Sequence, residues 1–554
     1  EKGRVILPNG TVKDLDASAI KEGTDEESGT TYRYFAFEGI EAGSEIEYMY
    51  VIEKQPDYTG SLYTIQDNVP SYNVLVELYT PSNLLFATKS YNNIPDFVQD
   101  TSVKDYNRWV LKIDTLEAYK SERVSFSEPF KGSYAYKLDK NTYTNKSDLV
   151  SYGFIAQTIF GNYTRDFDNA DEKAIKKMVK DIEKREGENV YRKIEDYIKE
   201  NYTIVESTQQ ELYFPSSIYN IKATNNYGAI SLFKEIFTAM NLPYKLVFTT
   251  NRIERYFDED FETYNSIDEG LYYLPEMDDY LNPTDRFSRL GYINPLLTAN
   301  KALFIEPLEM DDYVTGLGIV DYIPHKQASF SVDTMKLKVT FVDDQPSEPE
   351  VYLYRSMTGY NALDVQPYFH YIPKDKLKEF EETLFKYIDE EIDIHELNTK
   401  NTDVNDLGNK PFIVDGTLTL NKLIERAGPK YLFKIGLLIG PQMELYKEQD
   451  EEERTKPAMA QYARTYDRVI EFTIPKGYKI NNLDDIKINQ AYDFNDKPSM
   501  SFISDYTQNG SQVKVTINEY YEEVEYPVEV FENYRNVINA AANFNKVVLV
   551  IEEI

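Results

Sequence analysis

The side chains that carry most protein chemistry are scarce in this 554-residue chain. It contains no cysteine, which excludes disulfides, thiolate metal sites and cysteine catalysis. No two of its three histidines, His325, His370 and His395, have the spacing of zinc ligands, so we expect no metal site and no cofactor. No P-loop, Rossmann fingerprint, H-E-x-x-H or G-x-S-x-G pattern appears. Carboxylates number 94, and a pair of them could still hydrolyse a glycoside.

The acidic run at 258–260 and His370 are both interpreted as structural features rather than catalytic ones. The run Asp258-Glu259-Asp260 is typical of a solvated acidic loop. His370 lies among aromatic neighbours in the sequence YFHY, which favours a packed sheet residue over a catalyst.

Charge and composition narrow the possible partners. Lysine and arginine total 60 against 94 acidic residues, which gives a net charge of −34. Nucleic-acid binding needs cations to neutralise phosphates, so this balance excludes it and disfavours anionic lipid surfaces. Tyrosine is abundant, at 48 residues, and suits half-exposed sheet faces, whereas the single Trp109 does not favour a glycan-stacking surface. The longest apolar stretch, Tyr431–Met443, is short and contains Lys434, so no membrane span is expected.

The elements that would position a site begin with a β region over residues 1–160. Apolar and polar residues alternate with period two in EIEYMYVIE at 45–53, in VLVEL at 74–78, and again at Trp109, Leu111 and Ile113. Turn signals such as Pro8-Asn9-Gly10 separate these runs. The pattern predicts an antiparallel β-sandwich.

The middle of the chain changes to helical periodicity. Asn169, with Glu172 three residues later, predicts a helix start. A third helix is expected from about Tyr227 to Asn241, followed by a strand over Tyr244–Thr249. The helical stripes are Ile175, Met178, Val179 and Ile182, then Val190, Tyr191, Ile194, Tyr197 and Ile198, then Ile230, Phe233, Phe237 and Met240.

From about residue 310 the pattern returns to strands, with one helix predicted over Asp375–Asp389. The predicted strands near the end of the chain are Val469–Ile474, Val513–Ile517, Tyr526–Val530 and Val547–Ile551.

Three stretches in order along the chain resemble one bacterial architecture. ILPNGTVKDL, FEGIEAGSEIEYMYVIE and LYTIQDNVPSYNVLVELYTPSNLLF are similar to the N-terminal family of unknown function that precedes a transglutaminase-like core. IKATNNYGAISLFKEIFTAMNLPYKLVFTTNR, at 221–252, resembles the nucleophile helix of that papain-type core. LGNKPFIVDGTLTL, AGPKYLFKIG and RVIEFTIPKGYKI are similar to the β domain that usually follows.

The resemblance implies a multidomain α+β protein with three parts. These are an N-terminal antiparallel β-sandwich at 1–165, a papain-like or transglutaminase-like core at 166–312, and a C-terminal β-sandwich region at 313–554 with a helical insertion near 374–390. Members of the family carry further strands before the ILPNG segment. We therefore expect this chain to lack the first strands of its sandwich, leaving an open sheet edge or an empty groove.

The family's chemistry resembles that of papain-like enzymes, in which a cysteine attacks a carbonyl while a histidine, oriented by an aspartate, transfers the proton. Aligning the apolar run of the helix places Asn226 at the cysteine position. The Tyr264-Asn265-Ser266 segment places Ser266 at the histidine position, and the Leu281-Asn282-Pro283-Thr284 motif places Asn282 at the aspartate position. The resemblance thus implies a degenerate triad without a catalytic residue.

Two interpretations of these positions are open. Asn226 is a good helix-capping residue and could be purely structural. Alternatively, a vestigial cleft could bind a peptide or glycan; its candidate residues are Asn225, Asn226, Tyr227, Tyr264, Ser266 and Asn282.

We expect a non-catalytic, transglutaminase-like protein of the bacterial periplasm or cell envelope, or a secreted one, that acts in binding or scaffolding. Its partners would be peptide, glycan or another envelope protein. The opening EKGRVILPNG has no signal-peptide core, so a signal would have been removed. The alternative is a hydrolase that acts on cell-wall peptide or glycan through a separate, carboxylate-based site.

Overall fold

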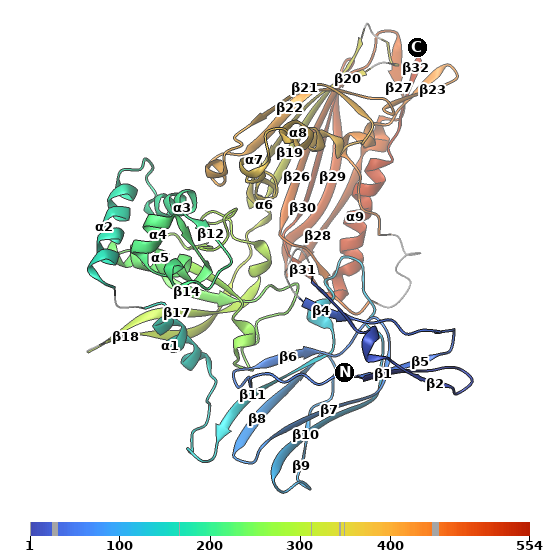
Figure 1. Ribbon diagram of the computed structural model, residues 1–554. Coiled ribbons are helices and arrows are strands. Elements are labelled where there is room, and N and C mark those ends of the chain that lie inside the picture. The colour runs from blue at the N-terminus through green and yellow to red at the C-terminus, as the bar shows by residue number, and fades with distance from the viewer. Residues whose placement is uncertain are drawn as a thin grey trace. The chain divides into compact units, whose positions relative to one another are not determined.

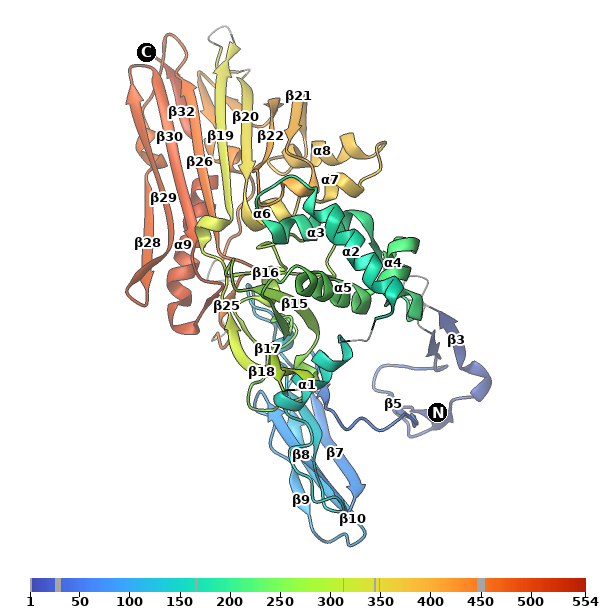
Figure 2. The same ribbon diagram turned by 90° about the vertical axis from the view of Figure 1, so that its left-hand side faces the viewer.

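The computed structural model describes residues 2–24, 31–164, 167–311, 313–342, 345–347, 349–445 and 454–554. The chain forms two compact units, Glu1–Tyr58 and Thr59–Ile554. Strands outnumber helices and form several separate sheets (Figures 1 and 2). The expectation of a multidomain protein of mixed α+β class is therefore confirmed. No helix within the described ranges is long and apolar enough to span a membrane.

The first unit is built from short strands. β1 pairs antiparallel with both β2 and β5, while β3 pairs with β4. Gly10 adopts a positive φ of 83° in the turn between β1 and β2, where a residue with a Cβ would be strained. The strand predicted from residue 45 is present and ends at Met49. The strands are β1 (Lys2–Ile6), β2 (Val12–Asp14), β3 (Lys21–Thr24), β4 (Thr31–Tyr34) and β5 (Glu45–Met49).

The second unit opens with two three-stranded antiparallel sheets that share a small core. The two predicted apolar stripes are cross-strand partners, because Trp109 pairs with Leu78 and Leu111 pairs with Val76. Leu111 is fully buried in this core. The sheets have the orders β7-β10-β9 and β6-β11-β8. Their strands are β6 (Ser61–Thr64), β7 (Ser71–Pro81), β8 (Leu84–Tyr91), β9 (Val98–Asp100), β10 (Tyr106–Leu116) and β11 (Ser133–Asn141).

Helix α1 (Tyr152–Asn162) corrects the β interpretation of residues 1–160. Ser151 caps it by accepting a hydrogen bond from the Phe154 N–H. Its buried face packs on β17 and β18, where a Cβ at Gly316 or Gly318 would overlap the helix. Alternation in the preceding strands obscures this short helix, whose stripe is Tyr152, Ile155, Ala156, Ile159 and Phe160.

Four helices and a five-stranded antiparallel sheet form the next part, and the predicted stripes at Met178, Ile194 and Phe233 are buried in its core. Asp168, rather than Asn169, caps the first of these helices. The helices are α2 (Asn169–Glu183), α3 (Val190–Asn201), α4 (Pro215–Ile221) and α5 (Asn226–Ala239). The sheet has the order β16-β15-β14-β17-β18, with β14 (Lys245–Thr249), β15 (Glu269–Leu274), β16 (Asp279–Leu281), β17 (Asn300–Met310) and β18 (Tyr313–Ile323); β12 (Thr203–Ile204) and β13 (Ala223–Thr224) pair separately.

An eight-stranded sheet dominates the rest of the chain. All its neighbours are antiparallel except β19 and β26, which run parallel. Its order is β21-β22-β20-β19-β26-β30-β29-β28, with β19 (Val332–Phe341), β20 (Pro349–Met357), β21 (Ile392–Lys400), β22 (Phe412–Leu420), β26 (Arg464–Thr473), β28 (Ile488–Phe494), β29 (Lys497–Asn509) and β30 (Gln512–Tyr521). Smaller sheets pair β23 (Ile424–Ala427), β24 (Lys430–Phe433), β32 (Leu549–Glu553) and β27 (Tyr478–Ile480), and β25 (Ala458–Met459) with β31 (Glu525–Tyr526).

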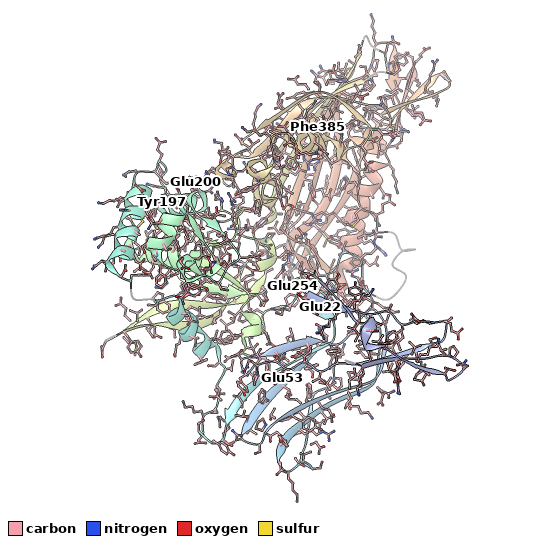
Figure 3. All side chains as sticks on the ribbon, viewed as in Figure 1. Glu22, Glu53, Tyr197, Glu200, Glu254 and Phe385 are labelled. Atoms are coloured by element: carbon pink, nitrogen blue, oxygen red, sulfur yellow. The ribbon has the colours of Figure 1, made fainter. Side chains whose placement is uncertain are left out.

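Helices cover part of this sheet. The predicted helix over Asp375–Asp389 is present as α8 (Leu377–Lys386), which carries Phe385 (Figure 3). The Phe385 side chain is fully buried. The predicted strand at Tyr526–Val530 is wrong beyond Tyr526, because a 3-10 turn leads there into α9 (Phe531–Asn545). Helix α9 packs against β28 and β29. Two shorter helices are α6 (Gly359–Leu363) and α7 (Tyr368–Tyr371).

Candidate functional site

The start of α5 carries the first predicted site position. Asn225, not Asn226, caps the helix, because its Oδ1 accepts from the Gly228 N–H at 2.9 Å. Its Nδ2 donates to the Ser207 carbonyl at 2.6 Å, and the residue is buried. Asn226 is the first helical residue and is exposed. The capping role predicted for Asn226 is therefore wrong by one residue.

Aromatic rings fill the space beside this helix start. The Tyr227 ring stacks on Tyr163 with centroids 4.8 Å apart and meets Tyr213 edge-on at 5.0 Å. Its hydroxyl donates to the Asn162 carbonyl at the end of α1. Burial, with a smaller contribution from Tyr227, raises the pKa of Tyr163 to about 12. Tyr227 thus ties α5 to α1, and its ring is part of the packing.

The second position, Ser266, ends a 3-10 turn just before β15. Its side chain is buried, and its Oγ accepts from the Asp258 N–H at 3.3 Å. The Tyr152 hydroxyl from α1 donates to the Asp258 carbonyl beside it. Tyr264, in the same turn, is half-buried against the core of α2–α5. Ser266 therefore lies between α1 and the 258 loop.

The third position, Asn282, directly follows β16. Its Oδ1 accepts from the Thr284 N–H and the Thr284 hydroxyl, both at 2.9 Å, and from the Asp285 N–H at 3.0 Å. The side chain is buried. These three bonds shape the turn that ends the strand, which is an ordinary structural use of asparagine.

The six predicted cleft residues lie in three segments of the chain. Asn225, Asn226 and Tyr227 share the start of α5, Tyr264 and Ser266 share the turn before β15, and Asn282 lies in the turn after β16. No contact recorded among the described residues joins Asn226, Ser266 and Asn282 to one another. The common cleft stays a prediction.

Ser266 lines a pocket of about 250 Å³ between the sheet β6-β11-β8 and the 254–266 loop. Asp258 lies in it, and its carboxylate accepts from Lys89 at 2.7 Å and from the Tyr91 hydroxyl at 2.8 Å. Burial would raise the pKa of Asp258, but hydrogen bonds from Lys89 and Tyr91 outweigh burial and lower it. The acidic run at Asp258 is therefore not a purely solvated loop, as the sequence had suggested.

The same pocket contains a hydrogen-bond donor that is not used. The Asn265 Nδ2 is buried and has no hydrogen-bond partner in the described structure. An unsatisfied buried donor is costly, so it marks a place where a ligand acceptor would be stabilised. The sequence pattern indicated Asn265 only as the residue before Ser266 and Asp258 only as part of a solvated loop. It did not indicate Lys89 or Tyr91, because residues from distant strands meet there only in the folded chain.

The three histidines have separate neighbours, and two of them contact polar atoms of other strands or loops. His325 contacts the Glu522 carbonyl, and His395 contacts the Thr419 hydroxyl. His370 is exposed on α7 and stacks edge-on with Tyr371, so its predicted place in a sheet is wrong. Within the described ranges, no group of three or more histidines and carboxylates could hold a metal ion.

Comparisons with known proteins agree with this architecture at both ends. Residues 1–120 match the model of a domain of unknown function with a solved structure, DUF3857. Residues 432–551 match a second model with the same description, DUF3858. The expected N-terminal family of unknown function is thereby confirmed, and the C-terminal region also has a family counterpart. No curated protein matches the chain.

One solved structure is similar over the full length. It is the crystal structure of "a putative protease" from Parabacteroides distasonis ATCC 8503, with a TM-score of 0.56 and 11% identity. The alignment covers 100% of this chain and 88% of that one. At this identity the likeness concerns the fold alone. The transglutaminase-like assignment and the domain limits at 165 and 312 stay predictions.

Proposed function

We propose that this protein is a non-catalytic, transglutaminase-like protein of the bacterial envelope that binds peptide or glycan. One observation carries the proposal: the side chains at the histidine and aspartate positions, Ser266 and Asn282, are buried and hydrogen-bonded to their own backbone surroundings. The order of the two family matches and the fold of the solved neighbour support the transglutaminase-like assignment.

Acyl transfer would need a nucleophile and a base in contact with it. Ser266 is the only hydroxyl among the three positions, and its Oγ accepts a backbone N–H. Asp258, a carboxylate of the same pocket, is held as an ionised partner of Lys89. Lys89 is itself paired with Asp258, so neither group is placed to take the serine proton.

The unused Asn265 amide makes the pocket around Ser266 the preferred binding site. Its Nδ2 would donate to a ligand carbonyl or hydroxyl, as both peptides and glycans provide. Tyr91 and Tyr256 line the same pocket and offer ring surface beside that donor.

Turnover and binding assays test the proposal. Purified full chain is incubated with amidase, protease and transamidation substrates, and we expect no turnover above buffer. Activity that Ser266→Ala abolishes would overturn the non-catalytic assignment. Binding of cell-wall peptide and glycan fragments is measured by calorimetry for wild type, Asn265→Ala and the control Asn361→Ala. Asn361 also has a buried amide nitrogen without a partner, but lies outside this pocket. Only Asn265→Ala should weaken binding.

One observation favours the alternative of a carboxylate-based hydrolase. Glu269 is exposed at the start of β15, and partial desolvation together with the nearby charges of Asp268 and Asp285 raises its pKa. Carboxylates whose environments separate their pKa values can divide acid and base roles. Hydrolysis of cell-wall glycan that Glu269→Gln removes would support this alternative. Fractionation of cells making the complete protein tests the proposed envelope location.

A further inference from the structure

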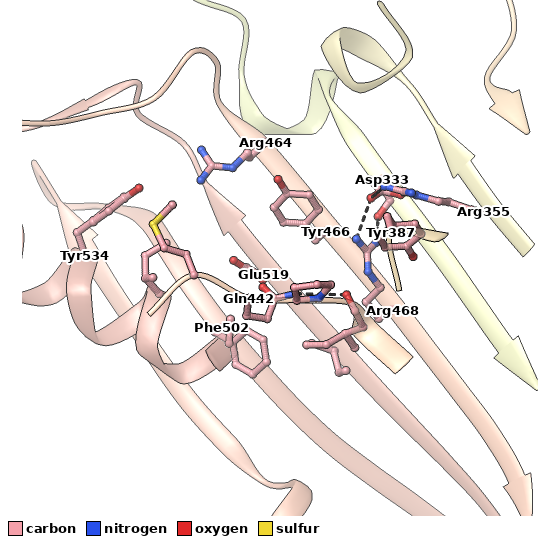
Figure 4. Close-up of a pocket in the computed structure, with 16 residues that line it drawn as sticks. Asp333, Arg355, Tyr387, Gln442, Arg464, Tyr466, Arg468, Phe502, Glu519 and Tyr534 are labelled. Carbon is pink, nitrogen blue, oxygen red and sulfur yellow. Dashed lines mark hydrogen bonds and ion pairs between the residues drawn. The ribbon is translucent and has the colours of Figure 1, made fainter. Parts of the chain in front are cut away.

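A cavity of about 300 Å³ lies in the C-terminal region, between the eight-stranded sheet and α9 (Figure 4). Arg464, Tyr466 and Arg468 point into it from alternate positions of β26, as the two-residue period of a strand requires. Glu519 reaches it from β30, and Tyr534 from α9. None of these residues belongs to the site considered above.

One end of the cavity is closed by a complete ion network. The Asp333 carboxylate accepts hydrogen bonds from Arg355 at 2.9 and 2.8 Å and from Arg468 at 2.8 Å. Burial alone would raise the Asp333 pKa, but the two guanidinium groups outweigh it and hold that pKa at about 2. Because Arg355 and Arg468 both have a counter-charge in Asp333, this end of the cavity needs no ligand.

At the other end of the cavity, the charged groups have no ion-pair partner among the described residues. The Arg464 guanidinium stacks over the Tyr521 ring at 4.5 Å, yet no hydrogen bond or ion pair is recorded for it among the described residues. The hydroxyls of Tyr466 and Tyr534 also have no hydrogen-bond partner among the described residues. Among the described residues, Glu519 accepts one hydrogen bond, from the Tyr521 hydroxyl at 2.8 Å, and burial raises the pKa of Glu519. Several donors and one carboxylate thus face the same space.

The charge of the lining points to the class of ligand. Three arginines oppose two carboxylates here, a local excess of one positive charge in a chain of net charge −34. A guanidinium fork suits a carboxylate or a phosphate. The buried Glu519 would repel a doubly charged phosphate more than a singly charged carboxylate, and it can accept hydrogen bonds from hydroxyl groups. Tyrosine rings offer flat surfaces for a sugar ring.

We propose that this cavity binds a sugar acid of monosaccharide size, with its carboxylate on Arg464 and its hydroxyls on Glu519, Tyr466 and Tyr534. The cavity volume is at the lower end of the range of small-molecule sites, which suits a ligand of this size. This site is separate from the pocket at Asn265, and either proposal can fail without the other.

Calorimetry on the full chain tests the site with glucuronate as the probe, and with glucose, acetate and inorganic phosphate as comparisons. We expect saturable glucuronate binding and weaker or no binding of the other three. Arg464→Gln should raise the Kd at least about tenfold, because a charge-assisted pair is lost. The matched control is Arg426→Gln, which removes an exposed arginine of β23 outside the cavity.

A second variant keeps the test decisive if Arg464→Gln does not fold. Tyr466→Phe removes one hydroxyl and keeps the ring, so it should weaken glucuronate binding without lowering the melting temperature. Tyr506→Phe, whose hydroxyl contacts Asp484 outside the cavity, is its control. The proposal is overturned if glucuronate fails to bind at up to about 10 mM, or if glucose or phosphate binds equally well. It is also overturned if Arg464→Gln and Tyr466→Phe both bind like wild type.

Discussion

At the scale of single residues, neighbouring side chains of one type have different roles. Asn225 is buried and satisfies two backbone groups, whereas Asn226 is exposed at the first position of α5. The Asn226 amide, at the position that the sequence resemblance aligns with a cysteine, is therefore available to solvent, and the Asn225 amide before it maintains the helix start.

Replacing Asn225 with alanine should lower the free energy of unfolding by about 1–2 kcal/mol, since the helix loses its cap and the Ser207 carbonyl loses its donor. Asn226→Ala is the control and should change it by less than about 0.5 kcal/mol. Urea unfolding, together with amide hydrogen exchange over residues 226–239, measures both. Equal effects of the two substitutions would contradict the assigned cap.

Asp333 is the residue whose charge the C-terminal region most depends on. Asp333→Asn should destabilise this region by about 3–5 kcal/mol at pH 7, because Arg355 and Arg468 lose their buried counter-charge. The Asp333 pKa lies at about 2, below its ordinary value of 3.8. Its ionised form therefore stabilises the fold above pH 3.8, and this contribution is lost as the pH falls from 3.8 towards 2.

The difference between wild type and Asp333→Asn should accordingly shrink below about pH 4, which thermal unfolding across pH can follow. The control is Asp393→Asn, an exposed carboxylate on β21. A wild-type advantage that stays constant down to pH 2 would refute the assignment.

At the scale of elements, close backbone approach decides which helical glycines are needed. A Cβ on Gly228 in α5 would lie 2.0 Å from the Leu212 carbonyl oxygen, so the helix could not keep its contact with the 210–212 turn. Gly161 in α1 has no heavy atom within 4 Å of the same position. Both glycines cost backbone entropy, but only the first has a steric reason to be glycine.

We expect Gly228→Ala to lower the melting temperature and disturb the start of α5, because a backbone carbonyl cannot move aside cheaply. Gly161→Ala should instead stabilise α1 by about 0.5–1 kcal/mol through the higher helix propensity of alanine. Thermal unfolding compares the two variants. A neutral Gly228→Ala would mean that the turn is not packed against α5.

At the scale of the whole second unit, buried polar links connect parts that are distant in sequence. Arg252 follows β14, is almost completely buried and donates to the Ala460 and Gln461 carbonyls at 2.6 and 2.7 Å. Two of its nitrogens have no partner in the described structure, and burial lowers its pKa. This side chain holds the segment before β26 against the α+β part.

Arg252→Met keeps the volume but removes both hydrogen bonds, so we expect a lower melting temperature and faster protease cleavage around residues 455–463. Arg426→Met, on exposed β23, is the control. An unchanged cleavage pattern would indicate that the link does not hold the segment in place.

Much of the secondary structure was predictable because local periodicity reports burial directly. The stripes at Leu111 and Val76 became cross-strand partners, and those at Met178 and Ile194 became helix faces in the core. Helix α9 was missed because residues 539–543 in its second half are only alanines and asparagines, which carry little apolar contrast. The candidate site was less predictable, since Asp258 meets Lys89 across 169 positions of the chain.

The sequence by itself determined the chemical limits of this protein. A chain without cysteine cannot perform thiol catalysis, and a net charge of −34 opposes nucleic-acid binding, because folding changes neither composition nor total charge. Only the tertiary structure decided which polar groups remain unmatched. Asn265 and Arg464 are ordinary in the sequence. Distant elements bury the Asn265 amide nitrogen without a hydrogen-bond partner in the described structure, and they place Arg464 in the wall of a cavity, so both become candidate ligand contacts.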